Sequence, residues 1–257
     1  METNQTESVF LPFKLPCVQG FFLKRSKRFT VEIRLASGQN LLLHSNNTGA
    51  MLGLQRPGSL ILASKSQNLK RKLLYTQEAV YVEEQKGLGQ ASQGFWVGVN
   101  TSVPNQLLAK AFYARSIPLL APYTTMRSEV KYGASRLDAH FSGAACPELW
   151  VECKNVTLVE DGVAAFPDAK SERARKHLHE LTKLVKCGQK AAMFYLVQRP
   201  DAHCFAPADY IDEEYARLLY LASKSGVVIL AYQALVSPKG IALGPRLPLA
   251  KSFLQSF

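Results

Sequence analysis

The chain has 257 residues, 47% of them hydrophobic and 20% charged, which is enough for two domains with ordinary buried cores. Its formal net charge of +11 favours a polyanionic partner such as nucleic acid. No apolar run approaches the roughly 18 residues that span a membrane, and the first ten residues do not resemble a signal peptide. We therefore expect a cytoplasmic protein with no membrane partner.

The five cysteines are scattered, and no CxxC or CxxH pair occurs among them. Zinc sites need closely spaced ligand pairs, and a disulfide framework needs an even number of cysteines, whereas this chain has five. The spacing and the number therefore argue against both.

The positive charge is concentrated in the first third of the chain. Between residues 8 and 77, eleven lysines and arginines stand against one acid, Glu32, a net charge of +10 that leaves the remainder nearly neutral. So one-sided a segment favours contact with nucleic-acid phosphates, and a solubilising surface is the alternative. The DNA-binding residues expected here are Lys24, Arg25, Lys27, Arg28, Lys70, Arg71 and Lys72.

Short strands joined by turns are predicted for this basic segment. Apolar and polar side chains alternate in several stretches, separated by turns at Ser37-Gly38 and Pro57-Gly58. The stretches are residues 28–35, 40–44, 59–64 and 73–84. Several short strands without a helix predict a small β-barrel, of which the OB-fold is a nucleic-acid-binding example.

Aromatic residues alternate with basic ones at the start of this barrel. Phe21, Phe22 and Phe29 stand among four lysines and arginines, a composition that suits base stacking combined with phosphate contact. The alternative is that the phenylalanines belong to the core, and we expect this of at least two of them.

The periodicity changes after the polar residues 83–93, which form either a linker or a long loop. We place the domain boundary here, with an N-terminal domain over residues 1–84 and a second domain over residues 85–257. The predicted helices cover residues 105–112, 171–188 and 211–226, and the predicted strands cover residues 133–141, 149–158, 191–198 and 227–236. Strands mixed with helices in this order predict an α/β (α+β) domain around a central mixed sheet.

Two charged residues interrupt the apolar strand predicted at residues 149–158. Glu152 and Lys154 are two positions apart, so in a strand their side chains share one face. Asp138 lies on the preceding strand of a predicted hairpin, where its carboxylate can meet Glu152. Glu129 lies further back, on the approach to that strand. Burying such charges is costly, so we expect them to be paired or used in chemistry.

Two roles fit this set of residues. Carboxylates can hold Mg²⁺ or Mn²⁺ through hard oxygen ligands, the metal can activate water, and the lysine can act on the water or on the phosphate. Alternatively, Lys154 forms a structural salt bridge with Glu152 or Asp138. The spacing alone leaves both open.

A Glu, then a Ser-Arg-x-Asp strand, then a Glu-x-Lys strand resembles the core of PD-(D/E)xK nucleases. Most of the chain also resembles the sugar fermentation stimulation protein A family. The matching stretches are KRF at 27–29, HSNNTGAM at 44–51, PG at 57–58, KRK at 70–72, VNTSVPNQLL at 99–108, RSEVKYGASRLD at 127–138, VECKNVTL at 151–158, FPDAKSERARKHLHEL at 166–181 and YIDEEYARLL at 210–219. The chain departs from the family pattern at Ala139 and Ala174, neither of which is a metal ligand.

The resemblance implies an N-terminal OB-like domain followed by a nuclease-like domain. It also implies DNA binding without marked sequence preference and a regulatory role in maltose metabolism. We expect Asp138, Glu152, Lys154 and Glu129 as catalytic residues, with the three acids as ligands of Mg²⁺ or Mn²⁺.

Three further residues, Arg173, Lys176 and His177, lie along the polar border of the helix predicted at residues 171–188. They either contact phosphate beside the metal site or form a solvated helix face.

Three functions remain open at this point: a DNA-binding protein with a nuclease-derived domain, a Mg²⁺-dependent nuclease, and an RNA-binding module. The sequence also leaves the oligomeric state open, a homodimer included.

Overall fold

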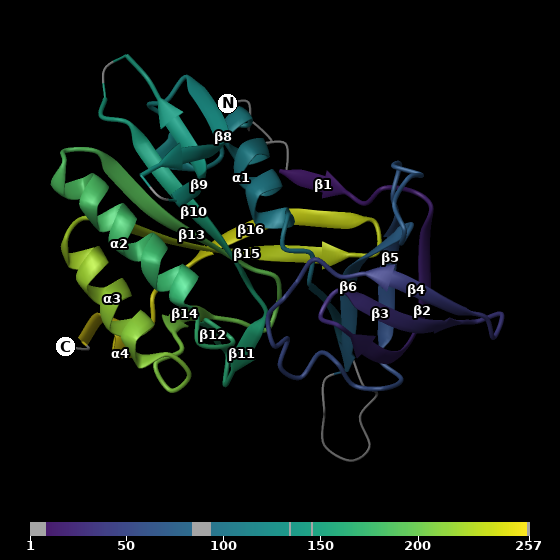
Figure 1. Ribbon diagram of the computed structural model, residues 1–257. Coiled ribbons are helices and arrows are strands. Elements are labelled where there is room, and N and C mark those ends of the chain that lie inside the picture. Colours follow the sequence, from purple (N-terminus) through teal and green to yellow (C-terminus); the bar gives the residue numbers. More distant parts are fainter. Residues whose placement is uncertain (1–8, 84–93, 134, 145, 256–257) are drawn as a thin grey trace, which may run out of the picture.

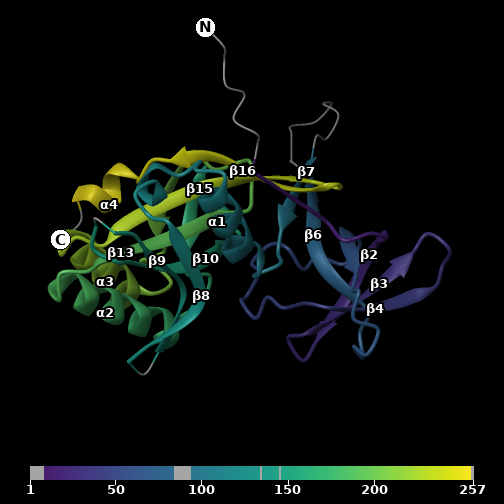
Figure 2. The same ribbon diagram turned by 90° about the horizontal axis from the view of Figure 1, so that it is seen from above.

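The computed structural model describes residues 9–83, 94–133, 135–144 and 146–255. Two bodies lie side by side, a β-barrel and a larger α/β domain (Figures 1 and 2). The expected OB-like barrel and the expected α/β domain with a mixed sheet are both confirmed. In the described part of the chain, no helix is both long enough and apolar enough to cross a membrane.

The barrel is one six-stranded sheet with the order β4-β3-β2-β5-β6-β7, and a further pairing between β4 and β6 closes it. Its strands are β2 (Cys17–Ser26), β3 (Thr30–Leu35), β4 (Asn40–His44), β5 (Leu60–Lys65), β6 (Tyr75–Glu83) and β7 (Gly94–Gly98). Alternating residues such as Val31 and Ile33 fill its core, as the period-two pattern predicted.

Two sheet pairings cross the domain boundary expected at residues 84 and 85. The strand β7 follows that boundary but pairs with β6, so the barrel extends to Gly98. The strand β1 (Phe10–Pro12) precedes the barrel but pairs with β16 of the other domain. Most of the expected linker, residues 84–93, lies outside the described residues.

Only one of the three phenylalanines in the basic segment belongs to the core, against our expectation of at least two. Phe22 is buried, whereas Phe21 is 50% exposed and Phe29 49% exposed. Phe21 and Phe22 are neighbours on β2 and therefore point to opposite faces of the strand. Phe29 lies in the turn between β2 and β3, outside both strands.

The α/β domain is built on a seven-stranded mixed sheet with the order β1-β16-β15-β13-β10-β9-β8, in which β10, β13 and β15 run parallel. A small sheet of β11, β12 and β14 packs beside it. The strands are β8 (Thr125–Tyr132), β9 (Ser135–Ser142), β10 (Leu149–Val156), β11 (Leu158–Glu160), β12 (Val163–Phe166), β13 (Lys190–Val197), β14 (Cys204–Pro207), β15 (Val228–Ser237) and β16 (Gly240–Leu247). The helices are α1 (Val103–Tyr113), α2 (Glu172–Lys186), α3 (Glu213–Lys224) and α4 (Lys251–Gln255), with a 3-10 turn at Pro118–Leu120.

The helices cover both faces of the large sheet. Apolar residues of α1, including Leu107 and Leu108, form one core cluster with Val151 and Phe194. Residues of α2 and α3 form a second cluster on the opposite face. The three predicted helices are confirmed, and the Ser171 hydroxyl caps α2 by accepting the backbone N–H of Ala174, 3.2 Å away.

Close contacts fix the barrel against the α/β domain. The backbone N–H of Gly98 donates to the carbonyl of Gln198 at 3.0 Å, and a Cβ at position 98 would collide with the Gln198 side chain. The Asp168 carboxylate accepts the backbone N–H of Met51 at 2.9 Å. Figure 2 shows the ends of β15 and β16 reaching the barrel beside β7.

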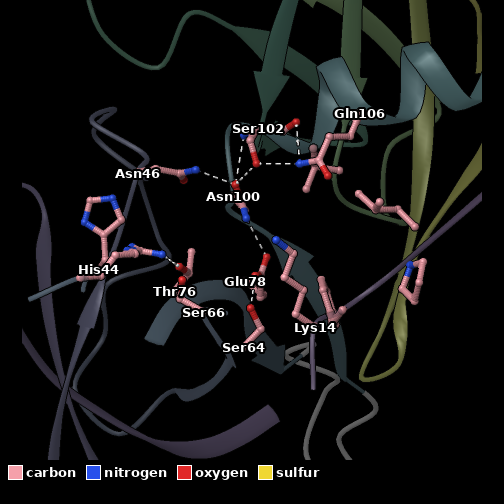
Figure 3. Close-up of a pocket in the computed structure, with 15 residues that line it drawn as sticks. Lys14, His44, Asn46, Ser64, Ser66, Thr76, Glu78, Asn100, Ser102 and Gln106 are labelled. Atoms are coloured by element: carbon pink, nitrogen blue, oxygen red, sulfur yellow. Dashed lines mark hydrogen bonds between the residues drawn. The ribbon is translucent and has the colours of Figure 1, made fainter. Parts of the chain in front are cut away.

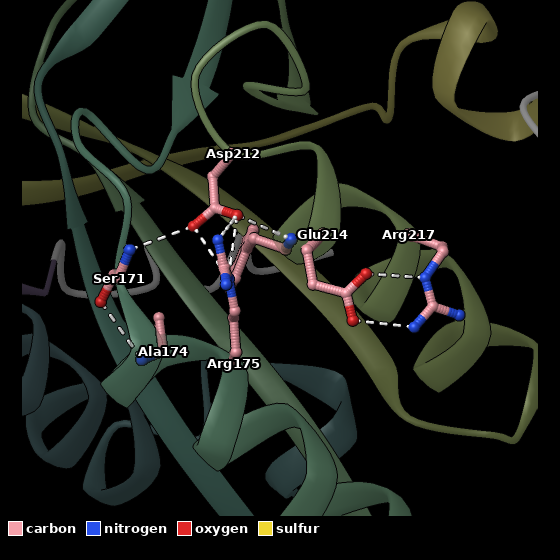
Figure 4. A network of polar contacts seen from close by, with 7 residues as sticks. Ser171, Ala174, Arg175, Asp212, Glu214 and Arg217 are labelled. Atoms are coloured by element: carbon pink, nitrogen blue, oxygen red, sulfur yellow. Dashed lines mark hydrogen bonds and ion pairs between the residues drawn. The ribbon is translucent and has the colours of Figure 1, made fainter.

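The Asp212 carboxylate joins the N-terminal ends of α2 and α3 (Figure 4). It accepts hydrogen bonds from Arg175 Nη2 at 2.6 Å and from the backbone N–H groups of Ser171 and Tyr215, both at 3.0 Å. Burial raises the pKa of Asp212, but these hydrogen bonds and the Arg175 charge outweigh burial, so the pKa lies below its ordinary value.

Replacing Asp212 with Asn removes this charge while keeping the shape of the side chain. We expect the Asp212→Asn substitution to lower the free energy of unfolding at neutral pH by about 1.5–3 kcal/mol, the range for hydrogen bonds to a charged group. The pKa is lower in the folded state, so the charge stabilises the fold fully above the unfolded pKa of about 3.9. That contribution is lost as the pH falls through the folded pKa. Urea denaturation should therefore show the difference from wild type shrinking below about pH 4.

The Glu214→Gln substitution on the same helix is the matched control. Glu214 pairs with Arg217 at 2.8 Å, but both side chains are close to half exposed, and solvent screens such a pair. An equal loss at both positions, or an Asp212 effect that does not change with pH, would contradict the role assigned to Asp212.

Candidate metal centre and nucleic-acid surface

The central strand β10 carries a buried carboxylate. Glu152 is only 2% exposed and lies between apolar residues of a strand that is paired on both sides, with β13 and β9. Its side chain points toward α2, on the opposite face from Cys153, which packs in the cluster with α1. A charge in this place requires partners.

Two side chains, a lysine and a histidine, meet the Glu152 carboxylate at one of its oxygens. Lys154 Nζ donates to Glu152 Oε1 at 2.6 Å, and His177 Nδ1 of α2 contacts the same oxygen. Burial raises the pKa of Glu152, but His177 and Lys154 together bring it below the ordinary value. The other oxygen, Oε2, is buried and has no hydrogen-bond partner among the described residues.

Asp138 lies at the point where β9 leaves β10. The last paired residues are Val151 and Ala139, and the same register places Asp138 opposite Glu152. Beyond this point a side chain supplies the hydrogen bond that a backbone carbonyl of β9 would otherwise accept. Asp138 Oδ2 accepts the backbone N–H of Cys153 at 2.8 Å. Its Oδ1 accepts from the Asn105 side chain of α1 at 2.9 Å.

The pKa of Asp138 is shifted in the opposite direction to that of Glu152. Burial raises it, and the nearby Glu152 charge raises it further, while the hydrogen bonds from Cys153 and Asn105 oppose the shift without cancelling it. Two carboxylates are therefore held close together, one stabilised as the anion and the other destabilised.

The four residues expected at one site all line one open cleft of about 520 Å³. Asp138, Glu152 and Lys154 lie within it. Glu129 lies opposite Asp138 in the β8–β9 register but has a left-handed backbone with φ of 54°, and its carboxylate pairs with the exposed Arg136 at 3.0 Å. The structure thus brings the expected set together, with Glu129 at the rim.

Within the described residues, no three His, Cys, Asp or Glu side chains are grouped closely enough to hold a metal ion by themselves. Mg²⁺, however, is commonly bound by one or two carboxylates, with water and substrate phosphate supplying the other oxygens. Two adjacent carboxylates, one with a buried oxygen that has no partner in the residues the structure describes, fit such an ion. His177 is bonded to Glu152 and was not expected to take part in the centre.

The basic residues expected to contact DNA differ in their exposure and in their contacts within the protein. The Arg25 guanidinium donates to the carbonyls of Arg28, Asn47 and Gly49, so it holds two barrel loops together. Lys24 is exposed and pairs with the half-buried Glu32 at 3.4 Å. Lys27 and Arg28 are exposed at the tip of the β2–β3 turn.

In the second basic loop, Lys70 and Lys72 are exposed, whereas Arg71 is half-buried and donates to the Thr76 hydroxyl at 3.0 Å. On α2, Arg173 is exposed and lines the carboxylate cleft, and Lys176 is also exposed. His177 is not on the surface as expected: its side chain is buried against Glu152.

Two contacts of the site were missed by reasoning from the sequence. Asn105, which holds Asp138, was interpreted only as part of a helix start. The pairing of His177 with Glu152 joins residues 25 positions apart, and the helical pattern placed His177 at the polar border. Its spacing from Ala174 and Leu178, both buried on α2, is the only local signal of burial.

Comparison with known proteins agrees with this architecture. The model of the sugar fermentation stimulation protein RE domain matches residues 102–240, and that of the SfsA N-terminal OB domain matches residues 23–99. The chain belongs to the sugar fermentation stimulation protein family.

Relatives described as sugar fermentation stimulation protein homologs align over nearly the full length of this family member. The homolog from Maridesulfovibrio salexigens is 50% identical over 236 residues, covering 91% of this chain and 94% of the relative. The homolog from Syntrophobacter fumaroxidans is 50% identical over 226 residues, covering 88% and 82%.

One solved structure shares the fold of this sugar fermentation stimulation family member. It is that of SfsA from Pyrococcus furiosus in complex with Ca²⁺, with a TM-score of 0.83 and 24% sequence identity, covering 94% of this chain and 99% of that chain.

Removing His177 should test how far the buried Glu152 depends on it. Breaking a buried pair by deleting one partner typically costs about 3–5 kcal/mol. Lys154 still contacts Glu152 in the variant, so we expect His177→Ala to lower the free energy of unfolding by about 3 kcal/mol in urea denaturation without divalent metal.

The control is His179→Ala, two positions along α2, where the side chain is exposed and a change within about 0.5 kcal/mol is expected. If the two substitutions had equal effects, the His177 contact would not be what stabilises Glu152.

Proposed function

We propose that this protein binds DNA without marked sequence preference through the basic face of its barrel, and that it holds a divalent metal ion at Asp138 and Glu152. The exposed cations of the barrel, among them Lys27, Arg28, Lys70 and Lys72, support the DNA contact. Lysine and arginine contacts to phosphates supply affinity but carry no sequence information. A DNA partner also agrees with the cytoplasmic location expected from the sequence.

The observation that carries the metal proposal is the Glu152 oxygen Oε2, which is buried, has no partner in the described part of the chain and lies next to a carboxylate whose pKa is raised. A hard divalent cation, Mg²⁺ or Mn²⁺, relieves both features because it prefers oxygen ligands and offsets the repulsion. The similar protein from Pyrococcus furiosus forms a complex with Ca²⁺, another oxygen-seeking cation. Glu129 lies at the rim of the cleft, where one of its oxygens is paired with Arg136.

Hydrolysis of phosphodiesters is the second candidate function, and Lys154 favours it. A bound metal would supply Lewis-acid stabilisation of a phosphate and an activated water. Among the chain's own groups, Lys154 lies in the cleft with its ammonium group at Glu152, where it can orient water and neutralise phosphate charge. Arg173 at the cleft wall adds a second cation for the DNA backbone.

A regulatory role in maltose metabolism, which the family resemblance implies, requires only occupancy of DNA. It is therefore compatible with either function, and cleavage distinguishes them.

Metal binding should raise the melting temperature, because an ion that binds only the folded state stabilises it. With Mn²⁺ at about 100 times its Kd, the stabilisation is about 2.7 kcal/mol, or a rise of roughly 5 °C or more. We expect Asp138→Asn to abolish the rise, and Lys154→Ala to retain it while losing any cleavage of DNA.

Asp161→Asn, in an exposed turn, is the matched control and should respond to Mn²⁺ like wild type. Thermal unfolding with Mn²⁺ and with chelator measures the effect. A wild-type protein without a metal-dependent shift and without cleavage would mean that the carboxylates are structural.

DNA affinity should fall steeply with salt, because each phosphate contact releases counterions. Between about 50 and 200 mM salt we expect the Kd for a duplex to rise at least tenfold. Reversing Lys27 and Arg28 to Glu should weaken binding strongly and flatten this dependence, as measured by fluorescence anisotropy.

The matched control reverses Lys183 and Lys186, which are exposed at the other end of α2 and give the same change in net charge. Equal losses from the two double variants would mean that overall charge, and not the barrel face, determines binding.

A further inference from the structure

A second pocket, of about 490 Å³, lies between the barrel and the α/β domain (Figure 3). Its walls come from β4, β5 and β6, from the segment between β1 and β2, and from the start of α1. Its volume falls in the range of small-ligand sites. Neither the metal centre nor the exposed basic loops account for it.

Hydrogen bonds between side chains shape this pocket. Glu78 is buried, and its carboxylate accepts from the Ser64 hydroxyl at 2.5 Å and from the Asn100 side chain at 2.8 Å. Asn100 in turn accepts from Asn46 at 2.6 Å. Asn46 follows β4 of the barrel and Asn100 precedes α1, so the network joins the two domains at the pocket and holds its polar groups in place.

The groups that line the pocket suit a nucleotide. Lys14 and Arg71 supply positive charge for a phosphate, and Figure 3 shows the Lys14 amine pointing into the pocket. Asn46, Ser66 and Gln106 offer donors and acceptors of the kind that bind sugar hydroxyls and base edges.

An aromatic platform leads into the pocket from the barrel surface. The rings of Phe29 and His44 are parallel within 7°, with centroids 6.4 Å apart. His44 lines the pocket, and Phe29 is 49% exposed to solvent. Exposed rings beside cations are the means by which proteins stack the bases of single strands.

The pocket adjoins the carboxylate cleft. Ser102 and Gln106, at the start of α1, line both. A strand held in the pocket would therefore lie beside the cleft that contains Asp138 and Glu152.

We propose that the pocket between the domains holds an unpaired nucleotide, and that the preferred ligand of this protein is single-stranded nucleic acid whose backbone runs on to the carboxylate cleft. The bases of an intact duplex are paired and stacked on one another, so they can neither stack on Phe29 nor enter the pocket. This inference rests on the proposed function, because it names the form of nucleic acid that the same surface binds.

The test compares the binding of labelled single-stranded DNA and of its duplex to the full-length protein, with chelator present to prevent cleavage. Wild type should bind the single strand more tightly. Phe29→Ala and Lys14→Gln should each weaken binding of the single strand about fivefold or more, the effect of losing one base stack or one phosphate contact, and leave duplex binding within about twofold.

Phe21→Ala is the matched control, because Phe21 is 50% exposed on the same barrel but lies outside this pocket. It should leave the affinity for both forms within about twofold, and melting temperatures close to wild type would show that all three variants fold. Equal losses for both DNA forms, or no loss for the single strand, would overturn the inference while leaving DNA binding intact. If wild type bound neither form, the proposed function would fail as well.

Discussion

The architecture of the α/β domain depends on a carboxylate buried in its central strand. Glu152 is only 2% exposed, on a strand that pairs with β13 along its length and with β9 up to Val151, so its charge has to be met largely within the protein. Lys154 meets it from the same strand and His177 from α2. The second contact fixes α2 over the sheet, because any shift of the helix would separate His177 from the acid and leave a buried charge with one partner fewer.

The cleft exists because β9 and β10 separate just beside this carboxylate. Their pairing ends at Ala139 and Val151. Where two strands separate, the backbone N–H and C=O groups that faced each other need other hydrogen-bond partners. Asp138 satisfies one of them, the N–H of Cys153, and is itself held by Asn105. The acid that closes the gap in the ladder is therefore the same acid that faces Glu152 across the cleft.

Local patterns in the sequence predicted the elements but not their long-range partners. Alternation and helical spacing located four of the barrel strands, β3 to β6, and the three long helices, but not β2 or β7. The spacing of Glu152 and Lys154 placed both on one face. The pairing of β1 with β16 joins residues more than 200 positions apart, and no local pattern carries it. β8 was interpreted only as an approach to β9, because it is a largely exposed edge strand without a clear apolar face. The sequence predicted that Arg25 is a surface residue that contacts DNA. In the structure its guanidinium donates to three carbonyls, in loops that meet only in the folded barrel.

The charges of the two domains act on a nucleic-acid backbone in opposite directions, one attractive and one repulsive. The barrel attracts phosphates, whereas Asp138 and Glu152 repel them, and contacts such as that between Gly98 and Gln198 hold the two regions at a fixed separation. A backbone bound to the barrel can therefore pass the carboxylates only if positive charge is present at the cleft. Lys154 supplies part of that charge but is already committed to Glu152, and Arg173 stands at the wall. A divalent cation between the carboxylates would supply the remainder and turn the repulsive part of the surface into an attractive one.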